Sequence, residues 1–428
     1  MRHLCAIVVA ALVAGSAAAQ DCFDGLAIFP TATPTSTYWG YGGIEQSGQD
    51  LFMAGLPFSS SGEKISILRP NATGTMAQVQ QVNAPSLSNF SANADVLAVA
   101  SATITSNGQV LVYTKVAATG QYALTTTISS TQSGQDFARR VAVSEDGNTL
   151  AVSAPGLSAT DAGKVAIYSR SPSGVWSLAI SLTVPGSKQL GKYLSFWGTR
   201  LAISEGASDK IHIFGRQGSV YVLSATVTNL SAGNYARGIA LSQDTLVIRS
   251  LSSASGPADR YEIFELVDDA WIRQTSLNLS GSINFDFEYG VLAVSYQLGS
   301  TIQARCYRKQ GTSNEWANFF TGNSTTGDTD YAGGISVESD RIAIAMPSFD
   351  APSSNNNGAA FLFDAVYVDC NSNGKRDECD IAAGTSVDSN GNLTPDECEN
   401  SCAADFNGDG IVDGADLGRL LTDWGTCP

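Results

Sequence analysis

The sequence predicts an all-β protein: a seven-bladed β-propeller of four-stranded antiparallel blades closed by its N-terminal strand, plus a small C-terminal calcium-loop module with one short helix. Three observations predict it. A unit of about 48 residues recurs along the chain. Each copy holds short runs rich in Val, Ile, Tyr and Phe with two-residue alternation. An acidic, cysteine-rich segment follows the last copy.

Composition limits the class of protein. The 428 residues are 43% hydrophobic and only 15% charged, which excludes a disordered chain or a coiled coil. The net charge of -16 disfavours nucleic acid and anionic membranes as partners. From Asp369 to Pro428 the chain has 13 Asp and Glu against 3 Lys and Arg, a net of -10. The C-terminal segment is therefore a separate module, expected at 369–428.

The N-terminus has the pattern of a secretory signal peptide over residues 1–19. Arg2 and His3 precede an apolar run from Leu4 to Val13, and small residues lead to a cleavage site after Ala19. The alternative, a membrane anchor, is disfavoured because the run is too short to span a bilayer. We expect a secreted protein, extracellular or at the cell surface, with no membrane insertion.

Each repeat is marked by a strand of the form Leu/Ile-Ala-Val/Ile. The third copy is clearest: Val141 opens a short strand, Leu150 opens the next, and further strands run to Tyr168 and from Trp176 to Leu182. The equivalent residues are Leu51, Leu97, Leu150, Leu201, Leu246, Leu292 and Ile342, at spacings of 46, 53, 51, 45, 46 and 50. They predict blades near 40–88, 89–135, 136–188, 189–234, 235–281, 282–330 and 331–366 within a propeller domain spanning 20–368.

A propeller follows because a single small sheet cannot bury both of its faces, whereas radially packed copies can. A string of β-sandwiches, the competing all-β arrangement, needs about 100 residues per domain and would not repeat at half that length. The last copy ends without an outer strand. Gly25–Phe29 resembles the outer strand of the third blade, so we expect residues 24–30 to close the seventh blade by pairing with Ala359–Phe363.

The repeated phrase resembles the FG-GAP repeat of integrin-alpha-type propellers. The matching segments are Phe137-Ala138 with Ser153–Pro155, Trp39-Gly40 with Ala54–Pro57, and Tyr331-Ala332 with Ala345–Pro347. The resemblance covers about residues 24–366 and implies the propeller fold without naming a ligand. Many members of that family carry Asp-rich calcium loops inside blades. Here the nearest segments, around Asp161 and at Asp328–Asp330, are too poor in carboxylates.

The acidic tail has the ligand spacing of calcium loops. Such a loop places side-chain oxygens at positions 1, 3, 5, 9 and 12 and a backbone carbonyl at position 7, usually with Gly at position 6. Three windows comply: Asp369, Asn371, Asn373, Lys375 (carbonyl), Asp377 and Asp380; Asp388, Asn390, Asn392, Thr394 (carbonyl), Asp396 and Glu399; and Asp405, Asn407, Asp409, Ile411 (carbonyl), Asp413 and Asp416. The alternative is an acidic linker without metal.

The third calcium loop resembles that of dockerin modules, and the first two resemble thrombospondin type 3 repeats. A dockerin normally pairs two loop-helix halves, whereas only the third loop here is followed by an amphipathic pattern, formed by Leu417, Leu420, Leu421 and Trp424. The resemblance implies bound calcium and a cohesin-like docking partner.

The cysteines fit an exported protein. Five of the mature cysteines lie in the tail, where cross-links substitute for a small core. Closure of the ring would bring Cys22 near Cys370. Cys379 and Cys398 then occupy the same position of successive loops, and Cys402 and Cys427 bracket the last loop, which leaves Cys306 as a buried free thiol. A bridge between Cys370 and Cys379 is the rival connectivity.

The search for catalytic groups yields no assignment. Asp286 and Glu288 share one side of a strand, and Glu262, Glu265, Asp268 and Asp269 cluster in blade five, which are weak candidates for a glycosidase acid pair. Ser144–Thr149 resembles a sialidase Asp-box but is better explained as a hairpin turn, and His212 as a satisfied strand residue. Tyr38, Trp39, Tyr41 and Trp197 are candidates for stacking on a ligand or for the core.

Two functional classes follow. The preferred one is a non-catalytic recognition or adhesion protein that binds an extracellular protein or carbohydrate, with a calcium-stiffened tail. The alternative is an extracellular carbohydrate-active enzyme with a dockerin-like tail.

Overall fold

The computed structural model describes residues 26–28, 37–57, 63–71, 76–101, 108–130, 136–228, 236–251, 259–298, 301–309, 316–323, 334–338, 341–346, 359–364, 381, 384–387, 395–399, 414 and 418. The chain divides into two compact units, one holding Gly25–Phe363 and the other holding Asp364–Pro428. Each unit is described by itself below.

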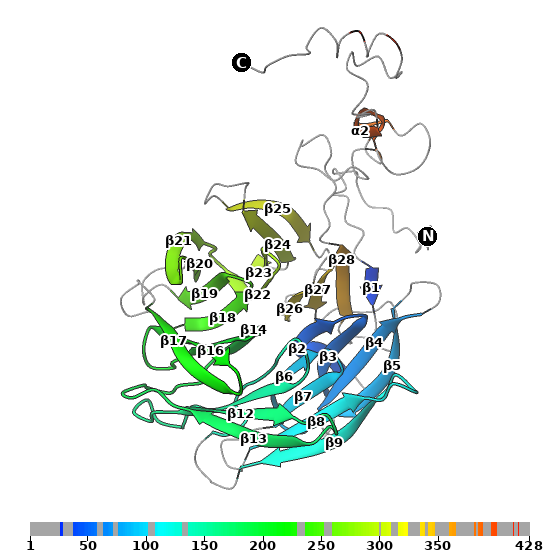
Figure 1. The fold of residues 1–428 in the computed structure, drawn as a ribbon. Helices are drawn as coiled ribbons and strands as arrows, with labels where there is room; N and C mark the ends of the chain where they lie inside the picture. Colours follow the sequence, from blue (N-terminus) through cyan, green and yellow to red (C-terminus); the bar gives the residue numbers. More distant parts are fainter. Residues whose placement is uncertain are drawn as a thin grey trace. The chain divides into compact units, whose positions relative to one another are not determined.

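The first unit is a propeller of seven four-stranded antiparallel sheets, as the sequence predicts (Figure 1). Blades one to three are β2 (Thr37–Ser47), β3 (Asp50–Pro57), β4 (Lys64–Pro70) and β5 (Met76–Asn83); β6 (Leu87–Asn93), β7 (Val96–Ser101), β8 (Gln109–Lys115) and β9 (Tyr122–Ser129); and β10 (Val141–Val143), β11 (Thr149–Ala154), β12 (Lys164–Arg170) and β13 (Trp176–Leu182). Blades four to six are β14 (Leu194–Trp197), β15 (Arg200–Ser204), β16 (Lys210–Gln217) and β17 (Val220–Thr228); β18 (Ala236–Ser242), β19 (Thr245–Leu251), β20 (Asp259–Val267) and β21 (Ala270–Asn278); and β22 (Ser282–Glu288), β23 (Val291–Leu298), β24 (Thr301–Lys309) and β25 (Trp316–Asn323).

The seventh blade contains both ends of the propeller sequence. Its strands are β26 (Ile335–Glu338), β27 (Arg341–Met346), β28 (Ala359–Asp364) and, on the outer edge, β1 (Leu26–Ile28). β1 pairs antiparallel with β28, with Leu26 opposite Leu362 and Ile28 opposite Ala360. The predicted closure by the N-terminal strand is confirmed.

The first strands of the blades surround the propeller axis. β2, β6, β10, β14, β18, β22 and β26 each contact the next strand in this order, and β26 contacts β2. In Figure 1 the fourth strands β5, β9, β13, β17, β21 and β25 lie on the rim. Because rotation about the axis relates the blades, the inner strands all begin at one mouth of the central channel and end at the other.

The hydrophobic core lies between neighbouring blades. Phe52 of blade one and Phe90 and Tyr122 of blade two belong to one buried cluster, in which the rings of Phe52 and Tyr122 meet edge to face at 5.5 Å. Burying a side chain of this size contributes about 1.5–3 kcal/mol to folding. The Leu/Ile-Ala-Val/Ile strand supplies the most buried positions of each copy, which explains why it is the best preserved part of the repeat.

A β-bulge recurs in the outer half of six blades. The register between the third and fourth strands shifts immediately before Leu68, Tyr113, Tyr168, Phe214, Phe264 and Tyr307, which are equivalent residues. A bulge increases the local twist of a sheet, and twisted sheets pack radially without splaying. The residue after the shift is large in all six blades and aromatic in five of them.

The second unit is described only in short segments. α2 spans Asp396–Glu399, and the Asp396 amide N–H donates to the Val387 carbonyl at 2.7 Å. The predicted helix around Leu417–Trp424 lies outside the described residues apart from Gly418. No helix within the described parts of the chain is long and apolar enough to cross a membrane.

Candidate functional site: the central channel

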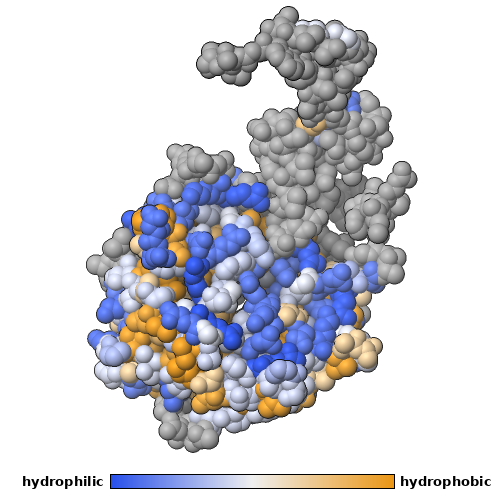
Figure 2. All heavy atoms as spheres, viewed as in Figure 1, coloured by the Kyte–Doolittle hydropathy of each residue, from blue (hydrophilic) through white to orange (hydrophobic). Residues whose placement is uncertain are grey.

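The candidate site is the central channel, which contains a cavity of about 440 Å³ lined by residues from all seven inner strands. In Figure 2 hydrophilic residues surround the centre of the propeller on the face shown. Several of the large apolar side chains that remain exposed lie on the fourth strands, such as Leu124 on β9 and Leu178 on β13. Polar groups therefore concentrate where the channel opens.

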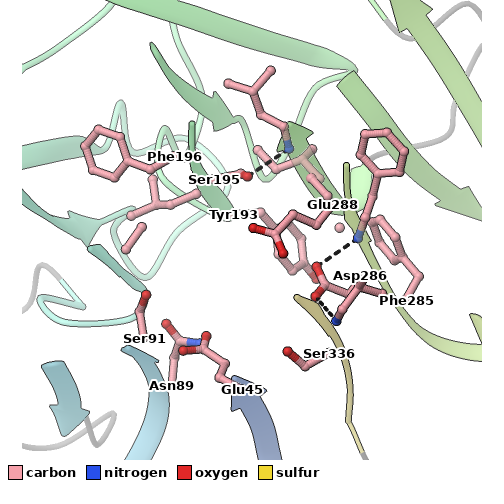
Figure 3. A pocket seen from close by; sticks show the side chains of 18 of the residues that line it. Glu45, Asn89, Ser91, Tyr193, Ser195, Phe196, Phe285, Asp286, Glu288 and Ser336 are labelled. Atoms are coloured by element: carbon pink, nitrogen blue, oxygen red, sulfur yellow. Dashed lines mark hydrogen bonds between the residues drawn. The ribbon is translucent and has the colours of Figure 1, made fainter. Parts of the chain in front are cut away.

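One position of each inner strand forms the wall of the channel. In each blade, one residue of the first strand pairs with the marker Leu or Ile of the second strand. The residue immediately before it on the first strand lines the channel, and we call its place the wall position. Its occupants are Glu45, Ser91, Ala142, Ser195, Ala240, Asp286 and Ser336. All of these residues line the cavity, and Figure 3 shows the five polar ones.

The polar wall residues also join the blades. Each accepts a hydrogen bond from a backbone N–H on the inner strand of the next blade. The pairs are Glu45 with Ala92 at 2.5 Å, Ser91 with Val143 at 3.2 Å, Ser195 with Leu241 at 2.9 Å, Asp286 with Val337 at 2.8 Å, and Ser336 with Gln46 at 3.1 Å. Five joints of one geometry fix neighbouring inner strands, so the wall is both polar and rigid.

Two wall residues are carboxylates held in a desolvating environment. Burial raises the pKa of Glu45 well above its ordinary value, with a further increase from the charge of Asp286 and an opposing effect of the Ala92 N–H. Burial likewise raises the pKa of Asp286, although its carboxylate accepts the N–H groups of Val337 and Phe287 (Figure 3). Both groups favour the protonated form more than a solvated carboxylate would.

The mouth at which the inner strands end carries aromatic and acidic side chains. The rings of Trp197 from blade four and Tyr289 from blade six meet edge to face at 5.1 Å. Burial and the negative charges of Glu288, Glu145 and Glu338 raise the pKa of the Tyr289 hydroxyl. Carboxylates from three blades therefore lie near this aromatic pair, which makes this mouth electronegative.

The weak acid-pair candidates occupy different environments. Asp286 and Glu288 both line the channel, as expected for alternating residues of one strand. Glu262 is fully buried and pairs with Arg260 at 2.6 Å and with Arg273, so it is a structural ion pair and not a solvated side chain. Glu265 pairs with Lys309 at 2.7 Å.

The remaining polar candidates have structural roles. Asp268 and Asp269 have positive φ values of 49° and 63° and form the two-residue turn between β20 and β21. In the segment Ser144–Thr149, Gly147 has a φ of 65° and the Ser144 N–H donates to the Thr149 carbonyl at 2.9 Å. The interpretation of that segment as a hairpin turn is confirmed.

His212 is a satisfied strand residue. Its Nε2 lies 2.8 Å from Glu205 Oε1 and its Nδ1 lies 3.0 Å from Thr226 Oγ1. Burial opposes ionisation of Glu205, but hydrogen bonds from His212 and Ser208 hold the pKa of Glu205 below its ordinary value. The imidazole does not line the channel cavity.

The aromatic candidates divide into two groups. Trp197 is half-buried and lines the channel. Tyr38, Trp39 and Tyr41 lie on β2, but the placement of their side chains is outside the described residues.

Most of the predicted metal ligands lie outside the described residues. Asp396 and Glu399 begin and end α2. The other predicted ligands, from Asp369 to Asp380, from Asp388 to Thr394 and from Asp405 to Asp416, lie outside the described residues. Within the described ranges no group of three His, Cys, Asp or Glu side chains is placed to hold a metal ion. The calcium loops remain predictions.

Of the cysteines, Cys306 is fully buried on β24 with its thiol retained, as expected, and burial raises the pKa of that thiol. The pairings proposed for Cys22, Cys370, Cys379, Cys398, Cys402 and Cys427 remain predictions.

Sequence reasoning missed Glu45 as a channel residue. The signal was available, because aligning the copies on their marker Leu or Ile places Glu45, Ser91, Ser195, Asp286 and Ser336 at one position. A polar residue that recurs where a β-branched one is expected marks a strand face turned away from the core.

No known family model and no curated protein matches this chain. Among solved structures, a periplasmic gluconolactonase of Pseudomonas aeruginosa is similar, with 18% identity, a TM-score of 0.50, and coverage of 65% of this chain and 84% of that chain. A second is a 6-phosphogluconolactonase assigned as putative from Bacteroides uniformis, with 14% identity, a TM-score of 0.50, and coverage of 65% and 85%. The Cps50 (Swd1) β-propeller domain of Myceliophteria thermophila has 9% identity, a TM-score of 0.50, and coverage of 79% and 99%. These similarities show the fold alone: the protein is a β-propeller.

Proposed function

We propose that this protein is a secreted, non-catalytic recognition or adhesion protein whose propeller binds an extracellular carbohydrate or protein at the central channel. The C-terminal module is then a calcium-stiffened stalk or docking element, with a cohesin-like protein as the candidate docking partner. The leader sequence and the loop spacing of the tail support export and calcium binding.

The observation that carries the proposal is the set of hydrogen bonds between wall positions and the next blade. Polar side chains that hold backbone N–H groups are fixed in place before a ligand arrives, which lowers the entropic cost of binding. The cavity of about 440 Å³ falls within the range of ligand pockets. The imidazole of His212 is held by Glu205 and Thr226 and does not serve this channel as a base.

One observation favours the alternative, a carbohydrate-active enzyme. Glu45 and Asp286 face the channel with raised pKa values, and a carboxylic acid that stays protonated can act as a general acid. Both carboxylates are, however, committed to backbone N–H groups of the neighbouring strand. That commitment favours a structural use of the two acids.

Arrays of extracellular glycans and secreted proteins test the proposal with the full chain and an Ala142→Phe variant. Ala142 lines the cavity and is 7% exposed, so a phenyl ring there would project into the channel and narrow it. A ligand bound by the wild type and lost in the folded variant supports channel recognition. Equal binding by the variant contradicts it. Glycan hydrolysis that Asp286→Asn or Glu45→Gln abolishes establishes the enzyme instead.

A further inference from the structure

The mouth at which the inner strands begin is basic. In blades two to six, the residue three places before the wall position lies at this entrance, and we call it the mouth position. It is Ser88 in blade two, Arg139 in blade three, Lys192 in blade four, Arg237 in blade five and Ile283 in blade six. Three successive blades therefore present a cation at one equivalent position, and we call these three residues the basic arc.

The arc is close enough to act as one electrostatic unit. Burial lowers the pKa of Lys192, and the charges of Arg139, Arg140 and Arg237 lower it further, against the opposing effect of Asp136. Arg140 belongs to the same group of charges, and its guanidinium lies 5.3 Å from the ring centre of Tyr193. Four cations from blades three to five thus lie close together on one side of this entrance.

Few acids neutralise these cations. Asp136 lies 3.9 Å from Arg139, and burial raises the pKa of Asp136 despite the nearby positive charges. Within the described residues, Lys192 and Arg237 form no ion pair and Arg237 is exposed. Other cations of the propeller pair closely with acids, such as Arg69 with Asp50 at 2.5 Å and Arg200 with Asp244 at 2.7 Å.

A group of like charges opposes folding by mutual repulsion, so its presence at the channel mouth indicates another use. In a chain with a net charge of -16, acidic residues are abundant, so the shortage of partners at this entrance is a local property. We propose that Arg139, Lys192 and Arg237 bind the carboxylate or sulfate groups of an acidic carbohydrate that enters the central channel. This inference rests on the proposed function, because it assigns a ligand class to the same channel.

The lining behind the arc favours a sugar over other anions. Asn89, Tyr193 and Phe285 line the cavity (Figure 3), which supplies an amide and a hydroxyl for sugar hydroxyl groups beside apolar ring surface; the guanidinium of Arg140 already lies over the Tyr193 ring. An extended polyanion such as nucleic acid is disfavoured, because the cations lie at a channel entrance and the chain as a whole is strongly acidic. The arc confines the anion to the channel mouth.

Titration calorimetry on the full chain tests the inference with a galacturonate hexamer and its methyl ester, and with a sulfated cello-oligosaccharide and its unsulfated form. The test variant carries Arg139→Gln, Lys192→Gln and Arg237→Gln. Ser88 and Ile283 show that neutral residues are accepted at the mouth position, so the variant should fold. The matched control removes three exposed cations that are not part of the arc, through Lys210→Gln, Arg216→Gln and Arg308→Gln.

We expect an acidic oligosaccharide to bind more tightly than its neutral form, with affinity falling as salt is added. Each cation should contribute about threefold, so the triple variant should bind about 30-fold more weakly while the control is unchanged. Binding only of the galacturonate identifies carboxylates as the recognised group, and binding only of the sulfated chain identifies sulfate esters.

Equal affinity for acidic and neutral chains, no binding of either acidic chain by the wild type, or an unchanged affinity in the triple variant overturns the inference. The Ala142→Phe variant separates this failure from failure of the proposed function. If Ala142→Phe abolishes binding and the triple variant does not, the channel binds a ligand without the arc. If a bound ligand is unaffected by Ala142→Phe, channel recognition itself is wrong.

Discussion

The Ser336 hydroxyl accepts the amide N–H of Gln46 at 3.1 Å and so joins the last blade to the first across 290 residues. The Gln46 side chain adds two bonds to blade seven, to the Ser336 carbonyl at 3.0 Å and to the Arg341 carbonyl at 3.2 Å. The backbone bond at the closing joint has the same geometry as those between blades within the ring. Closure therefore uses the repeat's own interaction, strengthened by one additional side chain.

Replacing Gln46 tests this joint. Gln46→Leu leaves two carbonyls without their donor in a buried position, which should lower the free energy of unfolding by about 1–3 kcal/mol. Denaturant unfolding measures the change, and Gln217→Leu on the exposed end of β16 is the control. An unchanged midpoint for Gln46→Leu would show that the amide contributes nothing to closure.

Removing the closing strand should have a larger effect. Deletion of residues 21–30 removes β1 and exposes the outer edge of β28 in blade seven. Because ring closure links the sequence ends, we expect the whole propeller to lose stability cooperatively, seen as one transition at lower temperature in calorimetry. A deletion variant that melts like the parent, or that loses only a minor separate transition, contradicts this prediction.

The two alanines at the wall position allow a gain of stability. At the wall position of blade four, Ser195 accepts the N–H of Leu241 in the next blade at 2.9 Å. The equivalent N–H for blade three is that of Phe196, and Ala142 has no side-chain acceptor for it. Ala142→Ser should supply the missing acceptor and stabilise the fold by about 1 kcal/mol, whereas Ser195→Ala should destabilise it by about as much.

Ala240→Ser is the matched control for that gain. The N–H that a serine at 240 would reach belongs to Phe287, which already donates to Asp286 Oδ1 at 2.8 Å. We expect no gain there. Equal unfolding free energies for Ala142→Ser and the wild type would mean that the joint is not equivalent in every blade.

The sequence predicts the ring well because its signals are local and repeated. Marker residues such as Leu150 are fully buried in every copy, so the period and the blade number follow from their spacing. Closure follows from the missing outer strand of the last copy, which Gly25–Phe29 supplies. The same alignment places the polar wall residues at one position, but it does not show which side chains meet across the channel. The basic arc arises when Arg139, Lys192 and Arg237, separated by 53 and 45 residues in the sequence, meet around an axis that exists only after closure.

Buried ion pairs likewise could not be predicted from the sequence. Glu262 looks like a solvated acid in sequence, yet Arg260 and Arg273 enclose it because β20 and β21 place alternate residues side by side. Whether two charged side chains on neighbouring strands meet depends on the register of those strands. A bulge between Ile263 and Phe264 shifts the register of β20 and β21 by one residue.

Stability should depend on the ionisation of Glu45. Its pKa is raised in the folded protein, so between its ordinary value and that raised value the folded state binds more protons than the unfolded state. The contribution of Glu45 is therefore favourable at low pH and is lost as pH rises, from roughly pH 4.5 upward, by at most about 1.4 kcal/mol per pH unit.

Glu45→Gln measures that contribution, because the amide oxygen can still accept the Ala92 N–H. The difference in unfolding free energy between variant and wild type should grow in favour of the variant with increasing pH. Gln217→Leu, which removes no titratable group, is the control and should show a constant difference. A pH-independent difference for Glu45→Gln would show that the carboxyl is solvated in the folded protein.

The C-terminal module should become ordered only with calcium. Its net charge of -10 repels itself when metal is absent, and the third loop, with Asp405, Asp409, Asp413 and Asp416, has four carboxylates where each of the others has three. The third loop should therefore bind most tightly. At a calcium concentration about a hundred times the dissociation constant, each site adds roughly 2.7 kcal/mol to the stability of the bound form.

Calorimetric titration of the full chain with calcium tests this prediction. We expect no more than three ions to bind. Asp405→Ala should remove the tightest of them. Because the apolar stripe of Leu417–Trp424 would then no longer fold back on the loop, protease cleavage near that segment should increase. Asp161→Ala, in a propeller loop too poor in carboxylates to hold calcium, is the control and should leave the titration unchanged. If the wild type binds no calcium, or if Asp405→Ala titrates like the wild type, the tail is an acidic linker and the docking role is lost with it.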